Sequence, residues 1–314
     1  MTAVVASGAL ATDVRRGLTR RPRALPPRWL YDERGSQLVD AITRLEEYYP
    51  TRREREILEA RATEVARRTG ADTLVEIGSG TSDKTRLLLD ALRDAGSLRR
   101  YMPFDVSADT LHAAAVRLAA AYPGIEIAPV VGDFHDDLDR LPGDGRRLIA
   151  FLGGTIGNLY PHERARLLRS IRAAAGPGGH LLLGADLVKD RTRLEAAYND
   201  AAGITAAFNR NVLAVLNREL GADFDLAAFV HVARWDAEQS WMEIGLAARG
   251  RQVVRIAALG MEVVFEDGEL LRTEISAKFQ REGLEQELRA AGLEPVAFMT
   301  DPARDFAVSL SRAA

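Results

Sequence analysis

The 314-residue sequence predicts an α/β fold in which a doubly wound, mostly parallel sheet is interrupted by a second domain. Two observations indicate this fold. Short apolar runs alternate with amphipathic helical patterns through the middle of the chain, and the segments on either side follow a different pattern. Parallel strands need a crossover connection, usually a helix, so strand–helix alternation is typical of a parallel sheet covered by helices.

The strands of this sheet are predicted from apolar runs that end at turn residues. They lie at 73–77, 99–105, 125–131, 147–152 and 179–186. The helical patterns between them lie at 83–95, 107–122, 135–140 and 161–175. Such a series of strand–helix units is long enough for a doubly wound sheet.

The flanking segments predict a second domain. Helical patterns fill 190–230, and the runs HVARWD, SWMEIGLAA and MEVVFEDG that follow resemble antiparallel strands. A helix at 280–292 and a strand at 306–311 then return to the pattern of the sheet. We therefore expect one domain from 53–188 plus 278–314 and a second from 1–52 plus 189–277. A ligand crevice is expected between them, beyond the carboxyl ends of the strands.

Composition narrows the classes of function. The 42 basic and 45 acidic residues are well mixed, and no run approaches the roughly 18 apolar residues of a membrane span, so neither a nucleic-acid nor a membrane partner is expected. The chain has no cysteine, which excludes disulfides and thiolate sites and fits a cytoplasmic protein. The five histidines lack metal-ligand spacing, so we expect no metal. The protein is also expected to be a monomer. The basic run at 15–28 is interpreted as a solvated arm.

A glycine-rich turn, EIGSGTSDKT, follows the first predicted strand. Glycines let the backbone turn sharply, and the next helix presents free N–H groups to a ligand. A dinucleotide fingerprint fails because Asp83 occupies the place of its third glycine, and a pyrophosphate would meet the carboxylates of Glu76 and Asp83. The same turn also occurs without any ligand.

Two acids at the next strand ends sharpen the interpretation. Asp105 ends the second strand, where it can accept from ribose hydroxyls. Asp133 ends the third, where it can accept from an adenine amino group beside Phe134. Each alone could be a loop acid or a helix cap. Together they favour S-adenosylmethionine over a dinucleotide, because a sulfonium with a zwitterionic tail tolerates acids better than a pyrophosphate does.

The fourth predicted strand ends in FLGGTIGN, residues 151–158. In this architecture that loop faces the transferable methyl group. Its glycines admit a substrate against the backbone, and Asn158 can donate to a carboxylate. The loop lacks the Asn-Pro-Pro-aromatic pattern of nucleic-acid amino-group methylation.

The sequence closely resembles the ergothioneine-pathway histidine Nα-methyltransferases over nearly its whole length, apart from about the first 20 residues. The matching stretches are YDERGSQLVDAITRLEEYYPTRREREIL, VEIGSGTSDKT, PFDVS, GDF, FLGGTIGN, AYNDAAGITAAFNRNVLAVLNREL and LRTEISAKF. The resemblance implies a Rossmann-like class I methyltransferase sheet with an inserted substrate-binding domain. It also implies S-adenosyl-L-methionine as cofactor and trimethylation of the α-amino group of L-histidine to hercynine.

The resemblance assigns roles to eleven residues. The cofactor-binding positions match Gly78, Lys84, Asp105, Asp133 and Phe134, the histidine-binding positions match Tyr48, Asn158, Tyr198, Glu274 and Ser276, and Tyr31 matches a catalytic tyrosine near the substrate amine. Asn199 stands where relatives often have aspartate.

The chemistry of these residues agrees with the assignment. Asn158 and Tyr198 can donate to the substrate carboxylate, and Glu274 and Ser276, two apart on a strand, can bond imidazole N–H groups. Without the resemblance, Tyr48 and Tyr198 could be core aromatics and Glu274 a surface residue. The alternatives are an N-methyltransferase of another aromatic amino acid or indole amine, a nucleotide-dependent oxidoreductase, or a non-catalytic binding module.

Overall fold

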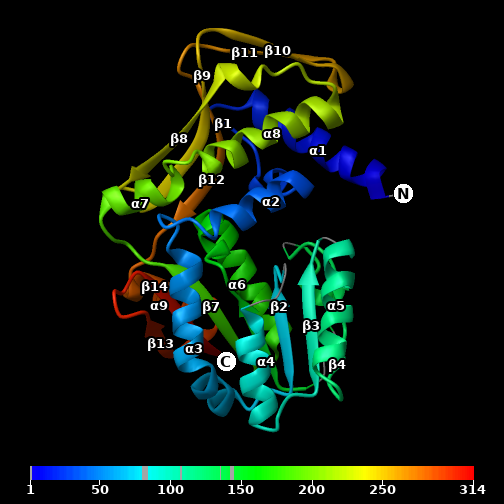
Figure 1. The fold of residues 1–314 in the computed structure, drawn as a ribbon, viewed down its shortest axis with the longest axis vertical. Helices are drawn as coiled ribbons and strands as arrows, with labels where there is room; N and C mark the ends of the chain where they lie inside the picture. Colours follow the sequence, from blue (N-terminus) through cyan, green and yellow to red (C-terminus); the bar gives the residue numbers. More distant parts are fainter. Residues whose placement is uncertain (1, 80–83, 107, 135, 142–144) are drawn as a thin grey trace. The chain divides into compact units, whose positions relative to one another are not determined.

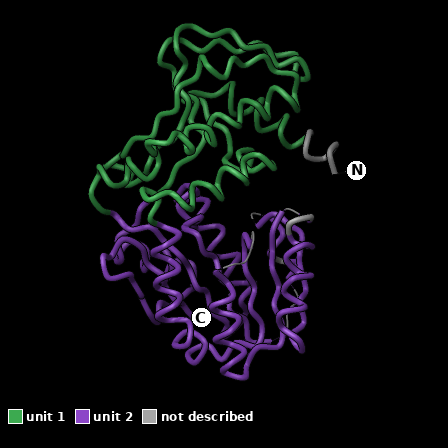
Figure 2. The backbone as a smooth tube through the Cα atoms, in the orientation of Figure 1, with its two compact units in different colours: residues 1–49, 189–277 green, residues 50–188, 278–314 purple. Residues whose placement is uncertain are grey.

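The computed structural model describes residues 2–79, 84–106, 108–134, 136–141 and 145–314. The chain forms two compact units, and each is assembled from two separate stretches (Figure 2). Unit 1 contains residues 1–49 and 189–277, and unit 2 contains residues 50–188 and 278–314.

Unit 2 is built on one sheet with the strand order β13-β14-β7-β6-β2-β3-β4, and β5 also pairs with β3 (Figure 1). Neighbours from β4 to β7 are parallel, whereas β14 is antiparallel to both β7 and β13. The predicted, mostly parallel sheet is therefore confirmed. The strands are β2 (Thr73–Ile77), β3 (Arg100–Asp105), β4 (Glu126–Ile127), β5 (Val130–Val131), β6 (Arg147–Phe151), β7 (His180–Asp186), β13 (Leu293–Thr300) and β14 (Phe306–Ala313).

Helices cover both faces of this sheet. The helices of unit 2 are α3 (Pro50–Thr69), α4 (Thr85–Asp94), α5 (Ala108–Ala121), α6 (Pro161–Ala175) and α9 (Arg281–Ala290). Apolar residues of α3, α4 and α5 share one core cluster with alternate residues of the strands, including Leu182. Leu181 and Leu183 point the other way and are equally buried, and α6 contacts both their strand and α9. Strands buried on both faces explain the continuous apolar runs of the sequence.

Unit 1 combines a four-stranded sheet of order β1-β12-β9-β8, a hairpin of β10 and β11, and several helices. The elements are α1 (Thr2–Thr19), β1 (Arg23–Ala24), α2 (Glu33–Ile42), α7 (Arg191–Tyr198), α8 (Ile204–Leu220), β8 (Phe229–Asp236), β9 (Trp241–Ala248), β10 (Gln252–Ile256), β11 (Met261–Phe265) and β12 (Leu270–Ala277). The sheet is antiparallel except for β1, which pairs with β12 in parallel. One core cluster joins α1, α2 and α8 to these strands.

Two predicted elements of unit 2 differ from the structure. The expected strand at 125–131 is split into β4 and β5, because Pro129 between them has no N–H to donate to the ladder. The expected helix at 135–140 contains, in its described part, only a 3₁₀ turn at Leu138–Arg140. The carboxylate of Asp137 instead accepts from the backbone N–H of Asp133 at 2.9 Å, a local bond that competes with helix formation.

The interpretation of the basic run at 15–28 as a solvated arm holds for most of its arginines, which are exposed, but not for Arg23. Arg23 is buried, pairs with Glu269 at 2.7 Å and lies 4.7 Å from the centre of the Phe265 ring. Arg28 pairs with Asp13 at 2.7 Å. These partners, distant in sequence, could not be read from the charge run itself. None of the helices in the described ranges has both the length and the apolar composition that a membrane span requires.

Candidate active site

The first glycine of the turn after β2, Gly78, has the conformation that favours glycine. Gly78 has a φ of +70°, a region in which residues with a Cβ are strained. Its N–H donates to the carbonyl of Phe104, at 2.8 Å, so the turn is attached to the end of β3. Gly80 and Asp83 lie outside the described residues.

Glu76 is buried and bonded to core residues, which the sequence argument did not expect. Its carboxylate is buried and accepts from the Tyr101 hydroxyl, at 2.5 Å, and from the Thr85 hydroxyl. As a residue inside a fully buried strand, Glu76 points into the core and finds its donors there. It joins β2, β3 and the start of α4.

The two predicted acids lie at neighbouring strand ends. Asp105 ends β3 and pairs with Val131 of β5, and its carbonyl accepts from Gly132 N–H at 3.1 Å, directly before Asp133. A Cβ on Gly132 would come within 2.7 Å of the Phe104 ring, so glycine lets these two strand ends approach. The structure therefore brings Asp105 and Asp133 to the edge of the sheet where the Gly78 turn lies.

Phe134 and Lys84 complete the predicted cofactor set. The Phe134 ring lies 5.5 Å from the ring of Phe151, which ends β6, so it stays at the same edge of the sheet. Lys84 caps α4 and makes an ion pair with Glu54, a fully buried residue of α3.

Glu54 also holds the loop after β6. Its other carboxylate oxygen accepts from Gly153 N–H at 2.7 Å, at the start of the loop that carries Asn158. Asn158 ends a 3₁₀ turn, Thr155–Asn158, and is partly exposed. A Cβ on Gly184 would lie 2.1 Å from the Glu54 carboxylate, so a glycine in β7 makes room for it.

In unit 1 the predicted substrate residues form a cluster. The Tyr198 hydroxyl lies 2.8 Å from the Ser276 hydroxyl, and the Tyr48 and Tyr198 rings pack edge to face with centres 6.2 Å apart. The Tyr31 ring packs on Phe208 of α8 with centres 5.4 Å apart. Glu274 precedes Ser276 by two residues on β12, and its charge acts on the Tyr31 hydroxyl.

Tyr31 is protonated at neutral pH. Although 46% of its surface is accessible, the surrounding protein desolvates its hydroxyl, which is the largest cause of a raised pKa. The negative charge of Glu274 and the nearby Tyr48 and Tyr198 act in the same direction. Tyr31 is therefore a neutral hydrogen-bonding group.

Asp32 fixes the backbone next to Tyr31. As the N-cap of α2 it accepts from Gly35 N–H at 2.8 Å, and it also accepts from Asn211 at 2.6 Å and Arg218 at 3.0 Å, both on α8. Partial burial alone would raise the pKa of Asp32, but these hydrogen bonds outweigh it and lower the pKa. The turn that presents Tyr31 is thus attached to α8 by an ionised carboxylate.

Comparison with known proteins decides the family. The model of a family described as histidine-specific, SAM-dependent methyltransferase matches residues 10–313. The chain belongs to this family. The histidine N-alpha-methyltransferase of Mycolicibacterium smegmatis is 57% identical over 98% of this chain and 95% of its own length. That of Mycobacterium tuberculosis is 56% identical over 96% and 94%.

Two more distant proteins complete the comparison. Ergothioneine biosynthesis protein 1 of Neurospora crassa is 34% identical over 89% of this chain and 32% of its own length. In structure, the methyltransferase resembles an S-adenosylmethionine-dependent methyltransferase from Clostridium acetobutylicum, with a TM-score of 0.50 at 11% identity, over 89% of this chain and 98% of the other. This likeness concerns the fold alone and agrees with the class I methyltransferase sheet expected from the sequence.

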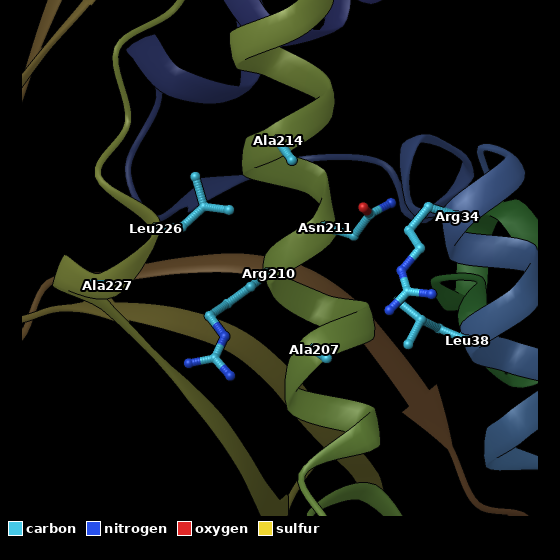
Figure 3. Close-up of a pocket in the computed structure, with 8 residues that line it drawn as sticks. All are labelled: Arg34, Leu38, Ala207, Arg210, Asn211, Ala214, Leu226 and Ala227. Atoms are coloured by element: carbon cyan, nitrogen blue, oxygen red, sulfur yellow. The ribbon is translucent and has the colours of Figure 1, made fainter.

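A surface hollow of about 370 Å³ in unit 1 is separate from the predicted residues of the methyltransferase. Side chains of α2, α8 and the 3₁₀ turn Leu226–Ala228 line it (Figure 3). Its lining residues are Arg34, Leu38, Ala207, Arg210, Asn211, Ala214, Leu226 and Ala227. None of the residues assigned a role by the sequence is among them, so we assign no substrate to it. Within the described ranges no group of three or more His, Cys, Asp or Glu side chains is placed to hold a metal ion.

Sequence reasoning missed Glu54, which connects Lys84 to the loop after β6. The available signal was its position on α3, four residues after Pro50 and three before Ile57, both of which are buried. A carboxylate at such a core position of an amphipathic helix needs a specific partner.

Proposed function

We propose that this protein transfers methyl groups from S-adenosyl-L-methionine to the α-amino nitrogen of L-histidine until the trimethylammonium product, hercynine, forms, as a step of ergothioneine biosynthesis. The family and its close relatives support the reaction class, and the Neurospora protein supports the pathway. The observation that supports histidine as the substrate is a cluster of residues that combines one carboxylate with several hydroxyl groups. Its members are Tyr31, Tyr48, Tyr198, Glu274 and Ser276.

Unit 2 is proposed to bind the cofactor. Asp105 and Asp133, at adjoining strand ends, offer acceptors to the ribose hydroxyls and the adenine amino group, with Phe134 beside the ring. Gly78 allows close approach to the backbone, and Lys84 supplies a cation. When bound, the cofactor supplies an electrophilic methyl group on a sulfonium.

Unit 1 is proposed to bind the imidazole ring. A neutral imidazole ring has one N–H, which the carboxylate of Glu274 accepts, and its other nitrogen accepts from the Ser276 hydroxyl. The Tyr198 hydroxyl can then donate to the Ser276 oxygen, since the two lie 2.8 Å apart and either atom can be the donor. Asn158 remains as a donor for the substrate carboxylate. A site of this kind rejects ligands that lack the ring N–H, because its polar groups would be left unpaired.

Alignment of the amine is the main contribution of the protein to the chemistry. The amine must be neutral before each of the three transfers, so a proton leaves before each step. Tyr31 is itself protonated, and so it orients the amine by hydrogen bonding, while the proton passes to water. The faces of Tyr31 and Tyr48 are suited to the ammonium cation that grows during the reaction.

The test is mass spectrometry of products after incubation with S-adenosyl-L-methionine and the twenty amino acids. We expect a single new product at the mass of trimethylhistidine. Methylation of another amino acid in place of histidine would refute the substrate assignment. Formation of only monomethylhistidine with excess cofactor would refute the trimethylation but not the substrate. The Asp105→Ala variant at equal concentration is the control for cofactor dependence.

A further inference from the structure

A chain of buried hydrogen bonds runs through unit 1 behind the substrate cluster. The Thr273 hydroxyl donates to the Asn209 side-chain oxygen at 2.5 Å. The Asn209 amide nitrogen lies 2.9 Å from His231 Nδ1 and donates to the Gly245 carbonyl at 2.9 Å. His231 Nε2 lies 2.8 Å from the carbonyl of Tyr198. We call Thr273, Asn209 and His231 the polar relay.

Chemistry fixes the direction of the relay. An amide nitrogen can only donate, so His231 Nδ1 is the acceptor, and the proton of a neutral ring must be on Nε2, where it is donated to Tyr198. Asn209 and Thr273 are each only 1% exposed, so each of their groups needs the partner that it has. The relay works only while His231 is neutral.

Both ends of the relay reach residues of the substrate cluster. One end is the backbone of Tyr198. The other end, Thr273, is the extra residue of a β-bulge: Arg272 pairs with Gly245 and Glu274 pairs with Ile244, which leaves Thr273 without a counterpart on β9. The residue after this bulge is Glu274.

The bulge decides which way Glu274 and Ser276 point. In the register that Leu271 and Leu246 set, Thr273 would pair with Ile244, and Glu274 would lie opposite the carboxylate of Glu243. The extra residue moves Glu274 and Ser276 onto the face of Ile244 and Met242, against which Tyr198 packs. A one-residue slip turns every following side chain to the other face of a sheet.

Gly245 shows how closely the strands approach at the bulge. A Cβ there would lie 2.7 Å from the Leu271 carbonyl, so only glycine fits without a shift. Its carbonyl is the second acceptor of the Asn209 amide. Asn209 of α8 is thus bonded to both strands at the place where the register changes.

We propose that Asn209, His231 and Thr273 are positioning residues for the substrate, which hold the bulge and the end of α7 so that Glu274, Ser276 and Tyr198 converge on the imidazole ring. The proposal rests on histidine as the substrate. None of the three touches the substrate; they act through the residues that do.

The position of His231 makes the relay sensitive to acid. Burial is the main cause of its lowered pKa, and Arg210 of α8 adds to it, while the bond to Tyr198 and the charge of Asp200 oppose the shift. Asp200 is itself occupied as the acceptor for Ile204 and Thr205 N–H. A protonated His231 would turn an N–H toward the Asn209 amide, where donor would meet donor, and the relay would break.

Two variants separate positioning from mere stability. His231→Leu removes both bonds, whereas His231→Gln keeps one acceptor and one donor and does not titrate. His180→Gln is the matched control, because burial also lowers the pKa of His180, in unit 2 and outside the relay. KM for histidine, kcat, and the Kd of S-adenosylhomocysteine are measured from pH 5.5 to 8.

We expect His231→Leu to raise KM for histidine about 10- to 100-fold at pH 7.5, with the cofactor Kd within about twofold of wild type. His231→Gln should match wild type at pH 7.5. Free histidine also titrates in this range, so KM rises in acid for every variant, and the informative quantity is the difference between variants. The rise should be smaller for His231→Gln than for wild type and His180→Gln.

Equal acid dependence of KM in wild type and His231→Gln would overturn the proposal, even if His231→Leu failed to fold. So would an effect of His231→Leu on kcat and cofactor binding as large as that on KM. If wild type did not methylate histidine at all, the proposed function would fail instead, and the two failures are thereby distinguished.

Discussion

Replacement of Glu54 by glutamine tests how Glu54 connects Lys84, a proposed cofactor-binding residue, to the loop after β6. The glutamine side chain of a Glu54→Gln variant has the same shape and keeps an acceptor for Gly153 N–H, but the negative charge that faces Lys84 is lost. Removing one partner of a buried ion pair costs about 3–5 kcal/mol. The Lys84 side chain is 23% exposed and can turn partly toward water, so we expect roughly 2 kcal/mol.

The assays are thermal unfolding and calorimetric titration with S-adenosylhomocysteine. About 2 kcal/mol corresponds to a melting point lower by roughly 4–8 °C for a unit of this size. We also expect weaker cofactor binding, because Lys84 loses the partner that orients it. Glu54→Ala should be worse, since it leaves the Gly153 N–H unpaired as well.

Glu56→Gln is the matched control. It lies on the same helix, but its ion pair with Arg53, at 2.9 Å, is partly exposed on both sides, and such pairs contribute about 0–1 kcal/mol. If Glu54→Gln melted within about 1 °C of wild type and bound S-adenosylhomocysteine equally well, the reasoning about this buried pair would be wrong.

Three further predictions concern binding, specificity and pH. Asp105→Ala should weaken S-adenosylhomocysteine binding by about 1.5–3 kcal/mol, the scale of a hydrogen bond to a charged group, and unchanged calorimetry would remove Asp105 from the site. Glu274→Ala should lower the specificity constant for histidine about 10- to 150-fold and reduce its preference over tryptophan; an unchanged histidine-to-tryptophan ratio would show that Glu274 does not read the ring. Burial lowers the pKa of His180 and of His231 in the folded chain, whereas the unfolded chain takes up these protons near pH 6.5. Stability should therefore be full above about pH 6.5, decrease as the pH falls below it and level off below the lowered folded pKa values. Denaturant unfolding at pH 7.5 and 5.5 measures this, and equal or greater stability at pH 5.5 would contradict it.

Features that depend on local periodicity could be predicted from the sequence. The strands that end at Ile77, Asp105 and Asp186 lie where the apolar runs placed them, because a strand buried on both faces must be apolar throughout. The residues that follow such strands are then placed at one edge of the sheet by topology alone. For this reason Gly78, Asp105 and Asp133 could be expected to lie near one another.

Features that depend on distant partners could not be predicted. The bulge at Thr273 is held by Asn209, which is 64 residues away and on a helix. The alternation of the sequence gives no sign that the register changes there. Glu54 likewise acquires its role through Lys84 and Gly153, which are 30 and 99 residues away. Even Glu76, which a strand-end pattern would direct toward a ligand, is turned inward by donors on other elements.

The order in which the strands pair has a consequence for synthesis of the chain. In unit 1, Arg23 and Ala24 pair with Leu271 and Arg272, which the ribosome adds about 250 residues later, or roughly 12–50 s at 5–20 residues per second. In unit 2, β14 pairs between β7 and β13, although β7 is synthesised about 120 residues before β14. Until Leu271 and Arg272 are synthesised, the apolar residues of α1, such as Val14 and Leu18, lack most of the residues that they pack against in the folded unit. Nascent chains of this enzyme should bind chaperones that recognise apolar helices, and the chaperone should be released from α1 only after β12 has left the ribosome.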